Sequence, residues 1–205
     1  MSETRATPTS APSAPSATSS TTTPARAAEA RLTAYLDGVS SAGIQWELGG
    51  REGEYVVTLP GEQKLKTVVS LLVRDRTTSV SAFVIRNPDE NHEEFYRTLL
   101  RKNLRLTGIA YAIDTDGDVY VRGELQTETV DEDRLDQLFG VILAAADSAF
   151  NELLAIGFLS SMRKEWAWRV SRGESTKNLD AFRHLLVDLE DPGSPGQPSD
   201  GASGS

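Results

Sequence analysis

The sequence predicts an α+β domain in which helices pack on an antiparallel sheet of about five to six strands, in the order helix, three or four strands, helix, two strands, long helix. Apolar residues recur every three or four positions from Thr129 to Met162, which predicts one long amphipathic helix. Over residues 44–84 and 109–125 the apolar period is two, as in strands with one buried face. Turns of two to five residues join these strands and are too short for parallel crossovers.

The ends of the chain differ in composition from its middle. Residues 1–25 are almost entirely Ser, Thr, Ala and Pro, which offer too little apolar surface to offset the entropy lost on ordering. They also lack the apolar run of a signal peptide. We expect disordered tails at 1–25 and 189–205, and a single domain at 26–188 that carries a helical extension at 163–188.

The first helix is expected from about Ala25 to Ala42, with Pro24 near its start and Gly43 at its stop. Its apolar face, and those of the four expected strands that follow, can be read from the spacing. The helix face comprises Ala28, Leu32, Tyr35, Leu36 and Val39; the inward strand positions are Ile44, Trp46 and Leu48, then Tyr55, Val57 and Leu59, then Leu65, Val69, Leu71 and Val73, then Val80, Ala82 and Val84.

The middle helix is expected to begin at Asn87 as the cap, with Pro88 at the first helical position, and to end near Leu104. Asp116-Gly117 predicts a two-residue hairpin between the last two strands. The buried positions expected here are Phe95, Tyr96, Leu99 and Leu100 in the helix, and Ile109, Tyr111, Ile113, Val119, Val121 and Leu125 in the strands.

The long helix is expected to start with a capping box, in which Thr129 and Glu132 each bond the other's backbone N–H. Arg163 and Lys164 lie near its other end, where the helix dipole favours cations. Its apolar stripe comprises Leu135, Leu138, Phe139, Ile142, Ala146, Ala149, Phe150, Leu153 and Ile156.

The composition of the chain argues against several classes of function. The net charge of -9 argues against broad binding to nucleic acid or anionic membranes. The longest apolar runs fall short of the roughly 20 residues that span a bilayer. With no cysteine, disulfides, thiol nucleophiles and thiolate metal sites are excluded. We expect a cytoplasmic protein.

No motif predicts catalysis, a cofactor or a metal. Asp114, Asp116 and Asp118 resemble the start of a calcium loop, but Gly117 stands in the fourth place and Leu125 in the twelfth, so a turn is favoured. The only histidines, His92 and His184, have no partner at helical spacing. The chain also has no Gly-x-Ser-x-Gly elbow and no glycine-rich phosphate loop. A non-enzymatic protein is therefore expected.

One basic and aromatic cluster follows the long helix, with Trp166, Trp168, Arg169 and Arg172 as candidate partner-binding residues. Tryptophan and arginine are enriched at protein-binding hot spots. The same residues could stack on single-stranded nucleic acid, or could close one end of the core while the arginines complement the helix dipole. The acidic total charge disfavours nucleic acid.

The element order resembles the YbjN family, described as bacterial sensory transduction regulators with a fold like that of type III secretion chaperones. The residues that carry the likeness are Asn87-Pro88-Asp89, Leu104–Gly108, Tyr111–Asp114, Gly117–Tyr120 and the Trp166–Arg169 extension, which looks like that of actinobacterial members. The likeness covers residues 26–186. It implies a non-enzymatic protein that presents a sheet and a groove to a partner chain.

Two functions are therefore expected. The first is an intracellular regulatory or chaperone-like protein-binding domain, forming a homodimer and binding a protein partner of unknown identity. The alternative is a small-molecule sensor that holds a ligand between the sheet and the long helix, near Trp46, Tyr111 and Tyr120.

Overall fold

A computed structural model describes residues 23–186 of the chain. The expected tails lie outside these residues, except that helix α1 begins at Pro24, so the last two residues of the expected first tail are helical. The helical extension is described as far as Leu186.

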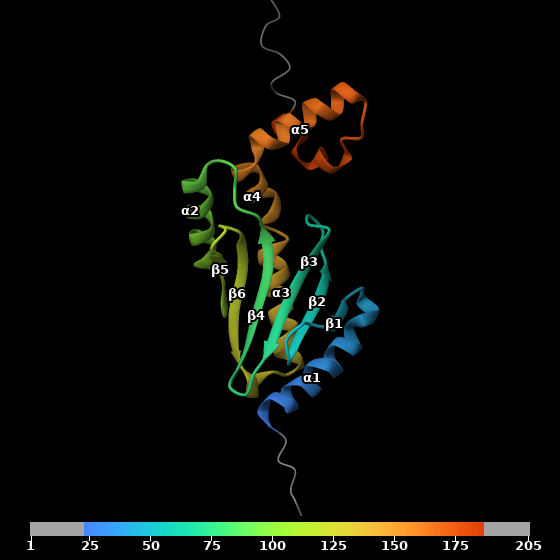
Figure 1. Cartoon of the computed structure of the whole chain (residues 1–205), viewed down its shortest axis with the longest axis vertical. Coiled ribbons are helices and arrows are strands. Elements are labelled where there is room, and N and C mark those ends of the chain that lie inside the picture. Colours follow the sequence, from blue (N-terminus) through green and yellow to red (C-terminus); the bar gives the residue numbers. More distant parts are fainter. Residues whose placement is uncertain (1–22, 187–205) are drawn as a thin grey trace, which may run out of the picture.

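Six strands form one antiparallel sheet in the order β1-β2-β3-β4-β6-β5, which confirms the α+β class (Figure 1). Neighbouring strands pair in defined registers throughout. The strands are β1 (Gln45–Leu48), β2 (Glu54–Pro60), β3 (Lys66–Val73), β4 (Thr77–Ile85), β5 (Ile109–Ile113) and β6 (Val119–Gln126).

Helices cover one face of this sheet, and the other face is open to solvent. Helices α3 and α4 run behind the sheet in Figure 1, α2 lies beside the edge strand β5, and α5 with the last short helices extends past the upper end. The helices are α1 (Pro24–Val39), α2 (His92–Asn103), α3 (Glu132–Ala146), α4 (Phe150–Gly157), α5 (Leu159–Arg172) and α6 (Arg183–Leu186), with shorter η1 (Ser40–Ala42), η2 (Thr127–Thr129) and η3 (Lys177–Phe182).

The core lies between the covered face and the helices. Strand residues at alternating positions, such as Val57, Leu71 and Val84, are buried against Leu135 and other stripe residues of α3 and α4. Most of the predicted inward positions are confirmed. Four of these predictions are wrong, because the side chains are exposed: Leu48, Leu65, Leu100 and Ile113. Leu65, at 90 %, precedes β3, and Thr67 takes the first inward position of that strand instead.

The prediction of one continuous helix from 129 to 162 is wrong. Asp131, not Thr129, caps α3, and its side chain accepts the Arg134 N–H at 2.9 Å. The helix is interrupted after Ala146, where the Asp147 side chain points inward to the β2–β3 turn. A second break falls at Phe158, whose backbone is not helical (φ −141°, ψ 12°). The predicted apolar stripe is nevertheless confirmed, because its residues face the sheet on both α3 and α4.

The middle helix begins at His92, later than predicted, with Asn91 in the left-handed region as its cap. Residues 87–90 are used for long-range bonds instead: the Asn87 N–H donates to Asp118 Oδ1, and the N–H groups of Asp89 and Glu90 donate to the Gly157 carbonyl. These bonds tie the start of α2 to the β5–β6 loop and to the end of α4.

The β5–β6 connection is longer than the predicted two-residue turn. It spans residues 114–118, and Asp114 Oδ1 accepts the N–H groups of Asp116 at 3.0 Å and Asp118 at 2.9 Å. Gly117 has φ +84°, the left-handed conformation that favours glycine. The three aspartates therefore build a turn, in which the carboxylates of Asp114 and Asp118 already accept backbone N–H groups.

Residues Glu132–Gly157 include a run that is long and apolar enough to cross a membrane, by length and composition alone. This differs from the expectation that the longest apolar runs fall short of a membrane span. In the fold, the apolar stripe of this stretch packs on the sheet, and the core helix of a globular domain passes the same test.

Candidate functional site

The structure forms a groove of about 400 Å³ where the upper end of β4 meets α4 and α5. We call it the α4–α5 groove. Its walls are mainly apolar, with a few charged groups at the margins. It is lined by Lys64, Phe83, Val84, Ile85, Arg86, Phe150, Leu154, Phe158, Ser161, Met162 and Glu165.

An irregularity in β4 shapes one wall. The β4–β6 register shifts between Phe83 and Ile85, so Val84 and Ile85 are both buried while Phe83 remains 37 % exposed. A β-bulge of this kind interrupts the ladder and redirects side chains. Phe83 packs edge-on against Tyr120 on the open face of the sheet, with ring centroids 5.5 Å apart.

Lys64 provides the only ammonium group among the groove residues. Its Nζ donates to the carbonyl oxygens of Phe83 at 2.5 Å and Val84 at 3.0 Å, at the bulge. It lies 5.0 Å from the ring centroid of Phe83 and 5.9 Å from that of Phe150. The groove therefore places a cation between two aromatic rings.

Burial lowers the pKa of Lys64 to about 8, and the nearby Asp147 carboxylate opposes part of that shift. Asp147 does not pair directly with the ammonium. Its carboxylate accepts the backbone N–H groups of Glu62, Gln63 and Lys64, with distances from 2.7 to 3.3 Å. Among the ion pairs of residues 23–186, none involves Lys64.

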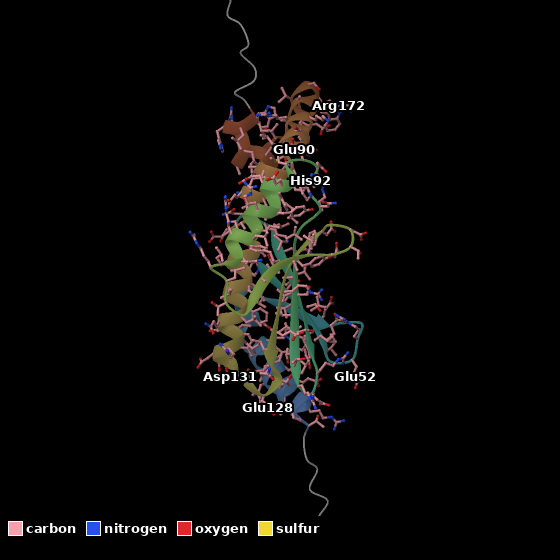
Figure 2. All side chains as sticks on the ribbon, turned by 90° about the vertical axis from the view of Figure 1, so that its left-hand side faces the viewer. Glu52, Glu90, His92, Glu128, Asp131 and Arg172 are labelled. Carbon is pink, nitrogen blue, oxygen red and sulfur yellow. The ribbon has the colours of Figure 1, made fainter. Side chains whose placement is uncertain are left out.

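The opposite margin is held by Arg86 and the start of α5. The Arg86 guanidinium lies 4.3 Å from the Phe158 ring centroid and forms two hydrogen bonds with the Asp89 carboxylate. These bonds, with one from the Ser161 hydroxyl, hold the pKa of Asp89 at about 2. Glu90 accepts both the N–H and the hydroxyl of Ser160, which anchors α5 to the start of α2; Figure 2 shows Glu90 at this upper end of the molecule.

The predicted basic and aromatic cluster lies on α5, outside the lining of the groove. Trp166 is half-buried beside a small second cluster of Met162, Leu179, Phe182 and Leu186. Trp168 is 48 % exposed, and the Arg172 guanidinium lies 5.0 Å from its ring. Arg169 pairs with Glu165 at 2.7 Å, and Glu165 lines the groove. The two tryptophans thus differ: one belongs mainly to packing and the other to the surface.

The three aromatic residues predicted to line a ligand groove do not lie together. Trp46 is on β1 and Tyr111 on β5, at opposite edges of the sheet. Trp46 donates to Asp37 on α1, and Tyr111 is buried with its hydroxyl bonded to the Ala145 carbonyl at 2.7 Å. Tyr120 points to the open face, because side chains alternate along β6.

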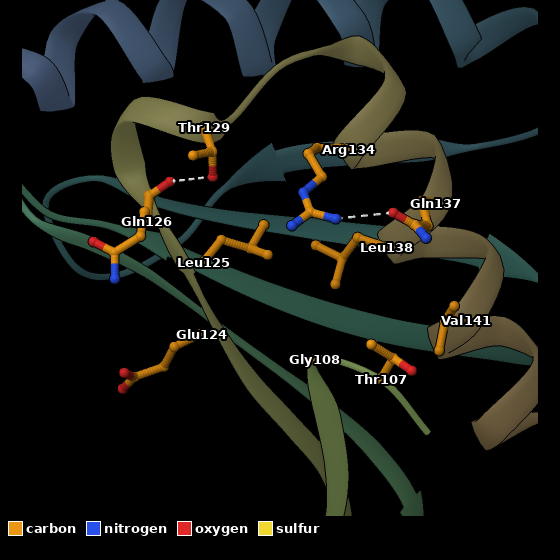
Figure 3. A pocket seen from close by; sticks show the side chains of 10 residues that line it. All are labelled: Thr107, Gly108, Glu124, Leu125, Gln126, Thr129, Arg134, Gln137, Leu138 and Val141. Atoms are coloured by element: carbon orange, nitrogen blue, oxygen red, sulfur yellow. Dashed lines mark hydrogen bonds between the residues drawn. The ribbon is translucent and has the colours of Figure 1, made fainter. Parts of the chain in front are cut away.

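A smaller hollow of about 270 Å³ does lie between the sheet and α3, but other residues line it (Figure 3). Leu125, Leu138 and Val141 form its apolar part. Arg134 and Gln137 bond each other at its margin, at 3.0 Å. A third hollow of about 460 Å³ lies on the open face, over serine and arginine side chains of β3, β4 and β6.

Among the described residues, no group of three or more His, Cys, Asp or Glu side chains could hold a metal ion. His92 and His184 are both exposed and lie on different helices, α2 and α6. No sequence pattern indicates Lys64 or Phe83 as site residues, because they come together only through the bulge and the β2–β3 turn. Among the groove residues, the sequence patterns indicate Val84 and Phe150, as part of the predicted inward strand face and of the predicted stripe.

Sequence comparison with known proteins finds a matching family and similar relatives. The family YbjN, described as "Putative bacterial sensory transduction regulator", matches residues 31–155. An uncharacterized protein of Mycobacterium tuberculosis is 50 % identical over 137 residues, which cover 67 % of this chain and 75 % of that protein. One of Mycobacterium leprae is 50 % identical over 136 residues, covering 66 % and 74 %.

Solved structures with a similar arrangement share little sequence. The ExsC-ExsE complex gives a TM-score of 0.46 at 16 % identity and covers 61 % of this chain and 95 % of that one. The Yersinia pestis type III secretion chaperone SycH, in complex with a fragment of YscM2, gives 0.40 at 21 % identity and covers 55 % and 94 %. The matched family region and the two relatives identify the chain: it belongs to the YbjN family.

Proposed function

We propose that this domain is a non-enzymatic, intracellular regulatory protein that binds a partner protein in the α4–α5 groove. The observation that carries the proposal is the groove itself, an open apolar hollow with Phe83, Phe150 and Leu154 accessible at its walls. Apolar side chains gathered around a concave surface are typical of protein-binding sites. Membership in a family described as regulatory supports the same function.

The groove is also well braced, which favours binding without large rearrangement. Its α5 wall is anchored to the start of α2 by the Glu90–Ser160 and Asp89–Ser161 bonds. Its floor is anchored by Asp147 and Lys64. A preformed site loses less conformational entropy when a partner binds.

Affinity capture from the source cell, with quantitative mass spectrometry, tests this proposal. Phe83→Ser removes the exposed ring from the groove, and Leu104→Ser is the matched control, because Leu104 is also exposed but lies after α2. We expect one partner to be retained by the intact chain and by Leu104→Ser and to be lost from Phe83→Ser, with all three proteins melting cooperatively. Equal capture by the folded Phe83→Ser variant, or no specific partner, would contradict the proposal.

The homodimer and the cytoplasmic location remain predictions. The open face of the sheet, which carries the partly exposed Val68 and Phe83, is the surface we propose for self-association. Sedimentation velocity at micromolar concentration should then show a dimer that Val68→Glu dissociates. A monomer at that concentration would argue against it.

A further inference from the structure

We propose that the segment bound in the α4–α5 groove is an apolar stretch of the partner protein that carries one carboxylate, and that this carboxylate pairs with Lys64. This inference rests on the proposed function, since it names the chemistry of the partner at the same groove. It follows from the way the charges around the groove are already paired.

The Lys64 ammonium has a hydrogen-bond donor to spare. An ammonium group carries three N–H donors, and the carbonyl oxygens of Phe83 and Val84 accept two of them. The aromatic rings of Phe83 and Phe150 flank the group. The third donor therefore depends on water or on a ligand.

The nearby charged groups are engaged elsewhere. Asp147 accepts three backbone N–H groups of the β2–β3 turn. Arg86 is paired with Asp89 at 2.6 Å, and Glu165 with Arg169 at 2.7 Å. Lys64 is thus the charge at the groove whose own ion-pair partner is missing among the described residues.

This arrangement selects the chemistry of the occupant. A wholly apolar segment would remove the remaining water from the ammonium and leave its third donor without an acceptor, which is costly. A carboxylate among the apolar side chains would accept that donor in a charge-assisted hydrogen bond. Charge complementarity of this kind fixes the register of a bound segment as well as its affinity.

Selection from a phage-displayed library of short random peptides tests the inference, with the intact chain as the immobilised target. We expect the enriched peptides to combine apolar residues with Asp or Glu. Binding of the best synthetic peptide is then measured by isothermal titration calorimetry against Lys64→Gln and Phe83→Ser. The matched control is Lys102→Gln, because Lys102 is paired with Glu152 away from the groove.

We expect Lys64→Gln to weaken binding by about tenfold or more, and Lys102→Gln to leave it unchanged. Replacing the peptide carboxylate by its amide should lower the affinity for the intact chain by a similar factor. The same replacement should lower the affinity for the Lys64→Gln variant little further. Such non-additivity is the signature of a direct pair.

Several results would overturn the inference. If acid-free peptides are enriched, or if the two losses add, the carboxylate does not pair with Lys64. If Phe83→Ser abolishes binding while Lys64→Gln does not, the partner chemistry is wrong and the groove remains the binding site. If neither variant matters, or if no peptide is enriched, the groove proposal fails too. A concentration-dependent dimer that Phe83→Ser dissociates and Val68→Glu does not would make a second copy the occupant of the groove.

Discussion

Replacing Asp147 by alanine should destabilise the domain more than its position near a helix end suggests. The side chain is buried between α3 and α4, and its carboxylate accepts the N–H groups of Glu62, Gln63 and Lys64. It joins parts of the chain that are 83 to 85 residues apart. The β2–β3 turn has no other described side chain that bonds these three groups.

The magnitude follows from those bonds. A hydrogen bond to a charged group contributes about 1.5–3 kcal/mol, and an unpaired buried donor costs about 1–3 kcal/mol. Glu62 and Gln63 are exposed, so water can replace part of what is lost at their N–H groups. We therefore expect Asp147→Ala to lower the free energy of unfolding by about 3 kcal/mol.

Urea denaturation, followed by tryptophan fluorescence and circular dichroism, measures this change. Asp147→Asn keeps one acceptor oxygen and should lose roughly half as much. Ser148→Ala is the matched control, because Ser148 is the exposed neighbour at the same helix break. Hydrogen exchange should also accelerate at the amides of residues 62–64. A change below about 0.5 kcal/mol, within the range of ordinary surface substitutions, would refute the reasoning.

Three further predictions test other features of the fold. Asp131→Ala should lower the free energy of unfolding, measured in urea, by about 1 kcal/mol, as expected for loss of a helix cap. Thr129→Ala should change it by less than about 0.5 kcal/mol. Comparable losses in the two variants would instead support the predicted capping box at Thr129. Thr67→Val should raise it by about 1 kcal/mol in chemical denaturation, because the buried Thr67 hydroxyl has no hydrogen-bond partner in the described structure; a loss would indicate an unseen partner. For Lys64→Met, the stability of the intact chain relative to the variant should rise from pH 7 to pH 10, since the pKa of Lys64 is about 8 in the fold against 10.5 unfolded, and the unfolded chain binds more protons between these values. The charges that face Lys64, on Asp147, Arg86 and Glu165, are present in both proteins. A difference in free energy of unfolding that does not change between pH 7 and pH 10 would therefore contradict the lowered pKa.

Much of the fold could be predicted because local patterns and tertiary packing agree. The alternation in β2, β3 and β4 matches their buried residues, and the stripe of the long helix faces the sheet even where the helix is interrupted. Gly43 ends the first helical region with φ +84°, as its position predicted. In each case the burial pattern is set by residues close together in the sequence.

The errors fall where distant residues compete for the same backbone groups. Residues 87–90 have the composition of a helix start, but the N–H group of Asn87 donates to Asp118, and those of Asp89 and Glu90 donate to Gly157. Asp147 resembles any polar residue on a helix, yet it binds a turn that precedes it by more than 80 residues. Period and propensity contain no information on such partners.

By itself the sequence determined the α+β class, the antiparallel strands, the apolar face of each main helix and the absence of cysteine chemistry. Only the tertiary structure decided where the proposed binding groove lies. Lys64, Phe83 and Phe150 come from a turn, a bulged strand and an interrupted helix, and none of these irregularities has a periodic signature. They meet because long-range hydrogen bonds fix the turn against the helix break, which is a property of the folded chain and not of any one segment.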